Sequence, residues 1–143
     1  MILGINPYLV LDGGGQEAVQ LYKEALDAKV EVMQTFGDMP ENPEYPIPAE
    51  AKERVAHAHL KIGNTELMIS DTFPGKGHAI GSQVTIAVRI SNAEKAKEVF
   101  EKLQEGGEVI MPLQETFWSP AYGQLKDKFS IEWQITTNPT EQK

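Results

Sequence analysis

The chain has no cysteine among its 143 residues. It therefore forms no disulfide, offers no thiolate to a metal ion and has no cysteine nucleophile. The absence of cysteine also fits a reducing compartment, and we expect the protein to be cytoplasmic. Residues 1–7 lack the basic start and the apolar core of a signal peptide. No apolar run approaches the roughly 18 residues of a membrane span, so we expect no contact with a membrane.

Positive charge is also scarce. The chain has 13 lysines and arginines against 21 aspartates and glutamates, which gives a formal net charge of -8. Proteins that bind a phosphate backbone need a basic face, so we expect no nucleic-acid partner. The apolar content of 41% and the charged content of 24% are ordinary for a globular protein. A chain of this length buries enough surface to fold as a single domain.

One glycine-rich segment invites comparison with a phosphate-binding loop. The run Asp12-Gly13-Gly14-Gly15 directly precedes a predicted helix. It lacks the Lys-Ser/Thr pair of a P-loop and the glycine spacing of a dinucleotide-binding loop. A turn that uses the conformational freedom of glycine is the better interpretation.

What the chain does contain is a pattern that occurs twice. A strand, a helix over 16–26 and an extended segment are followed, from about residue 84, by another strand, a helix over 92–105 and another extended segment. Both helices carry an apolar–aromatic pair three residues after an alanine, Leu21-Tyr22 in the first and Val99-Phe100 in the second. Two copies of one small unit predict paired modules, each with a face to bury.

The expected elements follow from hydrophobic periodicity and from the turn residues between them. In module one, about 1–72, they are a strand over 4–11, the first helix, a strand over 29–36, and a hairpin of 54–62 and 65–71. In module two, about 82–137, they are a strand over 83–90, the second helix, a strand over 108–113 and a hairpin within 121–137. Four prolines predict an irregular loop at 37–52, which is either a lid or a variable connection. Residues 72–82 are the expected linker, and the polar tail from residue 138 is expected to fray.

Alternation along the strands separates an apolar face from a mixed polar face. The apolar sets are Ala56, Ala58, Leu60 and Ile62; Val84, Ile86, Val88 and Ile90; and Ile131, Trp133 and Ile135. The opposing sets are Val55, His57, His59 and Lys61; Thr85, Ala87 and Arg89; and Glu132 and Gln134. We expect the apolar faces to lie under the helices. The mixed faces then line a concave surface or face plain solvent, and the concave surface is favoured if helices cover only one side.

Two candidate groups lie on these faces and loops. His57 and His59 share one strand face about 7 Å apart, where they could bind a metal or an anion, or simply be solvated or paired with carboxylates. A metal would need a third ligand, and no carboxylate has a ligand-like spacing from them. Trp118 and Tyr122 lie in an aromatic loop that either walls a pocket or packs against a neighbouring surface.

Several motifs resemble one family over nearly the whole chain. They are Pro7-Tyr8-Leu9, Glu17-Ala18, Leu21-Tyr22, His57-Ala58-His59-Leu60, Leu67-Met68-Ile69-Ser70-Asp71, Met111-Pro112-Leu113-Gln114-Glu115-Thr116-Phe117-Trp118 and Asp127-Lys128-Phe129-Ser130-Ile131-Glu132-Trp133-Gln134-Ile135. In this order they resemble the PhnB-like branch of the vicinal oxygen chelate superfamily, which contains glyoxalases, bleomycin-resistance proteins and dioxygenases. The resemblance implies an α+β fold of two βαβββ modules, a U-shaped mixed sheet around a cavity with helices on its outer face, and a homodimer.

The resemblance also implies where a metal would lie. Metal-using members place ligands on the first strand of each module and on the last strand, which corresponds here to Pro7 or Tyr8, to about Thr85, and to Gln134. None of these side chains is a strong ligand for a divalent metal, so we expect no cofactor, although a divalent metal remains possible. Many members carry a demethylubiquinone methyltransferase label, which no nucleotide-binding loop supports here.

Two functions therefore remain open besides a dimeric scaffold without a ligand. The favoured one is a metal-independent small-molecule binding protein of the resistance or sequestration type. The alternative is a metal-dependent lyase, transferase or dioxygenase with a rearranged site that uses His57 or His59. The predicted ligand-binding residues are Tyr8, His57, His59, Thr85, Trp118, Tyr122 and Gln134. The sequence identifies no catalytic residue.

Overall fold

The computed structural model describes residues 1–143 except 42, 45, 74–77 and 138–143. The chain divides into two compact units, Met1–Ala79 and Ile80–Lys143, which we call module one and module two. The division falls within the segment that the sequence identifies as a linker. The predicted frayed tail lies outside the described residues.

The described residues of each module form one α-helix and four strands. Module one consists of β1 (Tyr8–Leu11), α1 (Gly15–Ala25), β2 (Lys29–Thr35), β3 (Val55–Ile62) and β4 (Thr65–Asp71). Module two consists of β5 (Ile86–Ile90), α2 (Ala93–Leu103), β6 (Glu108–Gln114), β7 (Tyr122–Lys126) and β8 (Glu132–Thr137). The order βαβββ therefore occurs twice, as predicted.

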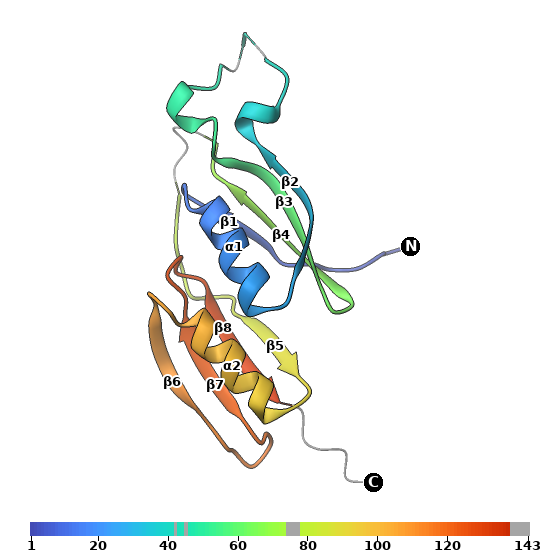
Figure 1. Ribbon diagram of the computed structural model, residues 1–143, viewed down its shortest axis with the longest axis vertical. Coiled ribbons are helices and arrows are strands. Elements are labelled where there is room, and N and C mark those ends of the chain that lie inside the picture. The colour runs from blue at the N-terminus through green and yellow to red at the C-terminus, as the bar shows by residue number, and fades with distance from the viewer. Residues whose placement is uncertain (42, 45, 74–77, 138–143) are drawn as a thin grey trace. The chain divides into compact units, whose positions relative to one another are not determined.

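The two sheets have the same topology. Their strand orders are β1-β4-β3-β2 and β5-β8-β7-β6. In each sheet the first strand pairs in parallel with the last, and the remaining neighbours are antiparallel. The predicted α+β class with paired βαβββ modules is confirmed (Figure 1). The shared cavity between the two sheets remains a prediction.

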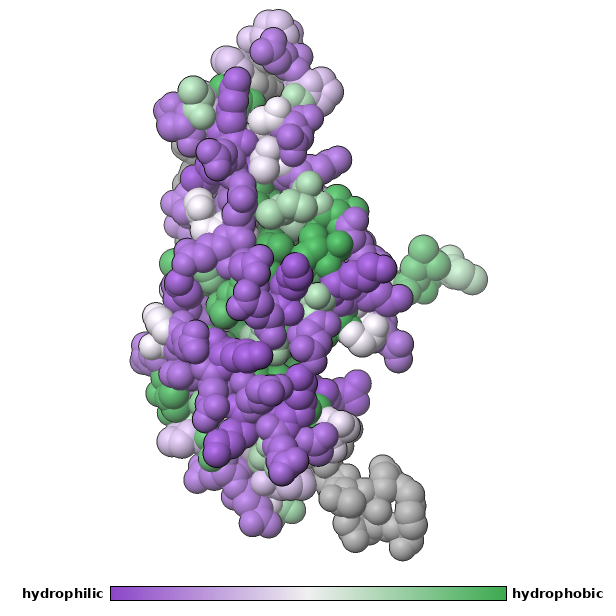
Figure 2. Space-filling model, in the orientation of Figure 1, coloured by the Kyte–Doolittle hydropathy of each residue, from purple (hydrophilic) through white to green (hydrophobic). Residues whose placement is uncertain are grey.

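One helix packs against one face of each sheet. The helix α1 contacts β2, β3 and β4, and α2 contacts β5, β7 and β8. Figure 2, in the orientation of Figure 1, shows mostly hydrophilic side chains over α1 and over α2. The helices therefore bury an apolar stripe and present a solvated face, which is the usual amphipathic arrangement. No helix in the described ranges is long and apolar enough to span a membrane.

The core of each module is the apolar strand face under its helix. In module one, Leu60 and Ile69 are fully buried, and in module two Leu125, Trp133 and Ile135 are at most 2% exposed. The predicted apolar faces are thus confirmed for β3 and β8. Val55 is also fully buried, although alternation places it with the histidines. A register shift between Gln34 and Thr35, opposite this end of β3, breaks the alternation there.

Two predicted strands begin later than expected. The strand predicted over 4–11 begins only at Tyr8, and the one predicted over 83–90 begins at Ile86. Pro7 has no backbone N–H to give to a ladder, although its carbonyl accepts a hydrogen bond from Met68 N at 3.1 Å. Val84 is 78% exposed and lies outside the sheet, so this apolar side chain does not pack in the core of module two.

The start of α1 depends on a buried carboxylate from β4. Asp71 is 4% exposed and accepts hydrogen bonds from the backbone amides of Gly13, Gly15 and Val55. A Cβ atom at Gly15 would lie 2.6 Å from Asp71 Oδ2 and 2.7 Å from Val55 Cγ2, so only glycine allows this close approach. The amides that a phosphate loop would present to an anion are therefore occupied by a carboxylate of the protein itself.

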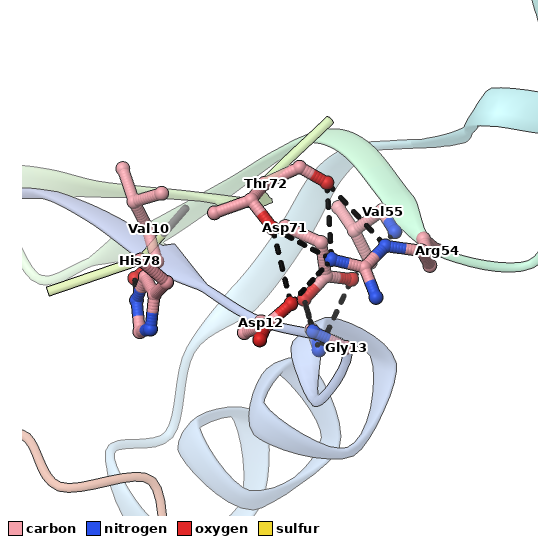
Figure 3. A network of polar contacts seen from close by, with 9 residues as sticks. Val10, Asp12, Gly13, Arg54, Val55, Asp71, Thr72 and His78 are labelled. Carbon is pink, nitrogen blue, oxygen red and sulfur yellow. Dashed lines mark hydrogen bonds and ion pairs between the residues drawn. The ribbon is translucent and has the colours of Figure 1, made fainter. Parts of the chain in front are cut away.

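A partly buried arginine network extends this contact (Figure 3). Arg54 donates to Asp12 Oδ1 at 2.9 Å and to the Thr72 hydroxyl and carbonyl at 2.7 and 3.1 Å. Arg54, followed by the Thr72 hydroxyl, holds the pKa of Asp12 below its ordinary value of 3.8. At Val10 within β1, the backbone carbonyl oxygen lies 2.9 Å from Nε2 of the His78 ring.

The proline-rich loop is less irregular than predicted. Short 3-10 helices lie at Phe36–Asp38 and Ala49–Ala51, at the two ends of the segment. Both lie outside the stretch from Pro40 to Pro48, and Pro48 itself occupies the N-cap of the second, where a missing N–H has no cost. The loop lines a partly open pocket of about 390 Å³ together with Phe36 and Lys52.

Candidate functional site

Five of the predicted ligand-binding residues lie on strands, namely Tyr8, His57, His59, Tyr122 and Gln134, whereas Thr85 and Trp118 lie outside them. On module one, Tyr8 comes from β1 and His57 and His59 come from β3, and all three lie on the sheet face opposite α1, which we call the open face, because Tyr8 and His59 both pair with Met68. The Tyr8 hydroxyl lies 3.4 Å from His57 Nδ1, and the two rings are 6.0 Å apart. The rings of His57 and His59 are 6.1 Å apart. The structure therefore brings these three residues into one row.

The row continues into a pair of carboxylates that the sequence analysis did not select. His59 Nε2 lies 2.7 Å from Glu66 Oε1 on β4. This nitrogen is shielded from solvent yet has no hydrogen bond to any described residue, so the contact is close without being aligned. One ligand atom each from Glu31, His59 and Glu66 lies within 4.8 Å of the others. Of the two histidines, only His59 therefore has two carboxylates of the described residues close to it, whereas His57 contacts Tyr8.

The corresponding face of module two carries a chain of uncharged polar side chains. Gln124 Nε2 donates to the Tyr122 hydroxyl at 2.9 Å, and that hydroxyl donates to Gln134 Oε1 at 2.9 Å. Gln134 Nε2 in turn donates to Thr85 Oγ1 at 2.7 Å. The chain orients each of its groups, and among the described residues the Thr85 hydroxyl proton and the Gln124 carbonyl oxygen have no further partner.

The aromatic loop before β7 lies beside this chain. The Trp118 ring is 5.3 Å from the Tyr122 ring and 4.8 Å from the Phe117 ring, both in edge-on arrangements. Trp118 is 47% exposed, whereas the next residue, Ser119, is buried and bonds through its hydroxyl to the carbonyls of Ala121 and Thr137. The loop is thus anchored at Ser119 and presents half of the indole to its surroundings.

The positions at which metal-using relatives hold their ion do not fit a metal here. Tyr8 offers a phenol that contacts His57, and Thr85 offers a hydroxyl. Gln134 already uses both ends of its amide within the chain. Divalent transition metals favour imidazole, thiolate and carboxylate ligands. The donor set that suits such a metal is instead Glu31, His59 and Glu66.

Sequence reasoning missed Glu31, Glu66 and Gln124. Gln124 lies two residues after Tyr122 on a strand, so alternation alone could have placed it on the open face. Glu66 requires the register of the β3–β4 hairpin, in which it pairs with Lys61. Glu31 lies at a register shift between Val30 and Val32, and no sequence signal marks that shift.

Two pockets lie away from these residues. One, of about 390 Å³, is the loop pocket described above. The other, of about 490 Å³, lies along α2 and β6 between Phe100, Val109 and Leu113. None of the predicted ligand-binding residues lines either pocket.

Comparison with known proteins identifies a family. Residues 4–135 match the Glyoxalase/Bleomycin resistance protein/Dioxygenase superfamily. The Escherichia coli (strain K12) protein YjdN is 31% identical in an alignment 140 residues long that covers 92% of this chain and 92% of that one. The structure of PA1353 from Pseudomonas aeruginosa is 34% identical, with a TM-score of 0.85 over 96% of this chain and 98% of that one.

Two further structures extend the comparison. A PhnB protein from Bacillus cereus, described as a putative 3-demethylubiquinone-9 3-methyltransferase, is 25% identical with a TM-score of 0.76 over 93% of this chain and 98% of that one. The fosfomycin resistance protein FosX from Listeria monocytogenes, solved with Mn(II) and 1S,2S-dihydroxypropylphosphonic acid, is 14% identical with a TM-score of 0.65 over 99% and 97%. The likeness to FosX shows the fold alone.

Proposed function

Because this chain belongs to the Glyoxalase/Bleomycin resistance protein/Dioxygenase superfamily, the vicinal oxygen chelate group, we propose that it is a small-molecule binding protein of the resistance or sequestration type. Its ligand is held by the polar side chains of the open sheet faces rather than by a metal at the superfamily's usual positions. The protein is proposed to act in the cytoplasm as a homodimer, with a small molecule and not a nucleic acid as its partner.

The observation that carries this proposal is the hydrogen-bonded chain of module two beside Trp118. The chain joins Thr85, Gln134, Tyr122 and Gln124 without a charged group. Pre-oriented neutral donors and acceptors next to an aromatic wall are typical of small-molecule sites. They suit an uncharged planar ligand, because the indole offers a stacking surface and the polar groups have no formal charge to neutralise.

The proposed independence from metal rests on the same contacts. A metal at the superfamily's positions would have to take the Gln134 amide oxygen from the Tyr122 hydroxyl, which lies 2.9 Å away. It would gain only a hydroxyl and a phenol as further ligands. Both are weak ligands for a divalent cation at neutral pH.

The test is a binding assay on the tag-free, chelator-treated chain. The probes are a panel of small uncharged aromatic compounds, together with bleomycin, after which the superfamily is partly named. Tryptophan fluorescence reports binding directly, since Trp118 is half-exposed and Trp133 is 2% exposed. A ligand that stacks on the indole should quench the signal of Trp118.

Trp118→Ala should weaken the binding of such a probe by about 1–3 kcal/mol, because a large apolar contact is lost. Phe73→Ala, which removes another partly exposed ring outside the proposed site, is the matched control and should bind as the wild type does. Isothermal titration calorimetry measures both. Equal affinity of Trp118→Ala and wild type for every bound probe would contradict the proposed pocket wall.

A second function is favoured by one observation. His59 contacts the carboxylate of Glu66 and has Glu31 within reach, which is the donor set of a rearranged metal site for a lyase, transferase or dioxygenase. Such an enzyme would turn over substrate only with metal added back after chelation. The methyltransferase description of the Bacillus cereus relative gains no support from the glycine segment, because Asp71 occupies the amides of Gly13 and Gly15.

A further inference from the structure

We propose that Glu31, His59 and Glu66 form a binding site for one divalent transition-metal ion on the open face of module one. This site is separate from the superfamily positions represented here by Tyr8, Thr85 and Gln134, and it does not rest on the proposed ligand binding. Its basis is the placement of three donor groups by three neighbouring strands.

The first argument is geometric. One ligand atom from each residue lies within 4.8 Å of the other two. Atoms that share a zinc ion at about 2.0–2.2 Å lie within about 4.4 Å of each other. Small rotations of the glutamate side chains therefore close the set around an ion. Glu31 is exposed and Glu66 is only partly buried, so both side chains have room to rotate.

The second argument is that the backbone fixes the donors before an ion arrives. His59 lies on β3, between β2 and β4, and pairs with Val32 on one side and Met68 on the other. The register shift next to Glu31 gives β2 an extra residue opposite β3. A bulge of this kind redirects a side chain, and here it brings the Glu31 carboxylate toward the face that carries His59.

The third argument is electrostatic. Two carboxylates lie close together, and within the described part of the chain Glu31 has neither a hydrogen bond nor an ion pair. Lys61 is the strand partner of Glu66, but no ion pair between the two is formed among the described residues. Like charges at this separation repel each other by about 1 kcal/mol in water and more near a protein surface. A divalent cation between them removes that repulsion.

The histidine supplies the fourth argument. His59 Nε2 is shielded from solvent, lies 2.7 Å from Glu66 Oε1 and makes no hydrogen bond within the part of the chain that the structure describes. A shielded ring nitrogen normally has a partner. A metal ion that binds this nitrogen and the Glu66 oxygen together satisfies both atoms.

The donor chemistry identifies the class of ion. Imidazole suits zinc, nickel, cobalt and copper, whereas magnesium and calcium favour sites made of oxygen atoms alone. Three protein ligands leave at least one position of a tetrahedral ion for water or another small molecule. We therefore expect Zn²⁺ and Co²⁺ to bind and Mg²⁺ not to compete with them.

The experiment titrates the tag-free, chelator-treated full chain with Co²⁺, followed by visible absorption, and with Zn²⁺, followed by calorimetry. The expected result is one ion per chain. Even outer-shell partners of metal sites change affinity by about 10–100-fold, so Glu31→Gln, His59→Gln and Glu66→Gln should each weaken binding at least tenfold. His78→Gln and Glu108→Gln, a histidine and a glutamate outside the cluster, are matched controls and should bind as the wild type does.

A further variant should change the affinity in the opposite direction. Lys61→Gln removes the positive charge beside Glu66 and should tighten Co²⁺ binding severalfold, which a merely structural role of the cluster would not produce. Far-UV circular dichroism of every variant checks the fold, and the exposed Glu31 provides a variant that removes no buried contact. No Co²⁺ or Zn²⁺ binding by the wild type, or wild-type affinity in all three ligand variants, would overturn the proposal. Neither result concerns the binding of small aromatic probes by the chelator-treated protein. The metal-site proposal can therefore be contradicted while the proposed function stands, and the reverse also holds.

Discussion

Asp71 shows how one buried carboxylate connects three segments of module one. Its oxygens accept hydrogen bonds from Gly13 and Gly15 at the start of α1 and from Val55 at the start of β3. A buried amide that loses its acceptor costs about 1–3 kcal/mol. The residue therefore fixes where α1 begins relative to the sheet, although it takes no part in the proposed ligand contacts.

Replacing Asp71 should destabilise the protein strongly. Asp71→Ala leaves three amides without their acceptor, and we expect a loss of about 3 kcal/mol or more in the free energy of unfolding. Asp71→Asn keeps the shape of the side chain and one acceptor oxygen, so its free energy of unfolding should fall by less. Urea denaturation followed by circular dichroism measures both variants. A loss below 1 kcal/mol for Asp71→Ala would mean that water replaces the carboxylate at these amides.

Asp12 makes stability depend on pH in a defined direction. The Arg54 contact and the Thr72 hydroxyl lower its pKa from 3.8 in the folded protein. The unfolded chain therefore takes up this proton first as the pH falls, and the contribution of Asp12 is present above pH 3.8 and is lost on acidification through the lowered pKa. Asp12→Asn should show a shallower loss of stability below pH 4 than the wild type. Urea midpoints between pH 2 and pH 7 test this, with Glu108→Gln as an exposed control that should follow the wild-type curve.

At the scale of elements, β3 separates core from site along a single strand. Ala58 and Leu60 are fully buried under α1, while His57 and His59 lie on the opposite face. Because successive side chains point to opposite faces of a strand, one set of β3 residues packs in the core and the other set lies on the face proposed to contact a ligand.

Substitutions on the two faces of β3 should have contrasting effects. The double variant His57→Ala with His59→Ala should unfold cooperatively, with a midpoint close to that of the wild type. Leu60→Ala creates a cavity and should cost about 2–5 kcal/mol. Thermal and urea denaturation measure both. If the histidine variant fails to fold while Leu60→Ala remains stable, the assignment of the two faces is reversed.

The elements also show which features a sequence can predict. His57, His59 and Gln134 follow from alternation within one strand, because that pattern is local. The site partners Glu31 and Glu66 depend on the register between strands, and the shift at Glu31 is invisible until β2 and β3 are paired. The ends of strands are equally hard to predict, since Val84 continues the apolar alternation of β5 in the sequence but is 78% exposed in the structure.

At the scale of the whole molecule, the repeat lets the two modules be compared position by position. The registers make His57 the counterpart of Tyr122 and His59 the counterpart of Gln124, since His59 pairs with Met68 as Gln124 pairs with Gln134. At these two positions module one carries imidazoles where module two carries a hydroxyl and an amide, whereas the carboxylate of Glu66 recurs as Glu132, each with a lysine as its strand partner. One fold repeated twice therefore differs between its copies in the imidazoles of β3, which are the groups on which the proposed metal site depends.

The homodimer proposed for this chain can be tested by its mass. Met1, Ile2, Leu3 and Ile5 are all at least 89% exposed, and Figure 2 shows apolar residues of this segment protruding into solvent. Apolar groups that gather on a surface mark interaction sites. We therefore expect a mass near twice 15.9 kDa in sedimentation equilibrium. Replacing Ile2, Leu3 and Ile5 together by serine should weaken the association if this segment is part of the interface. A single-chain mass at every concentration would contradict the dimer, whereas an unchanged dimer of the triple variant would place the interface elsewhere.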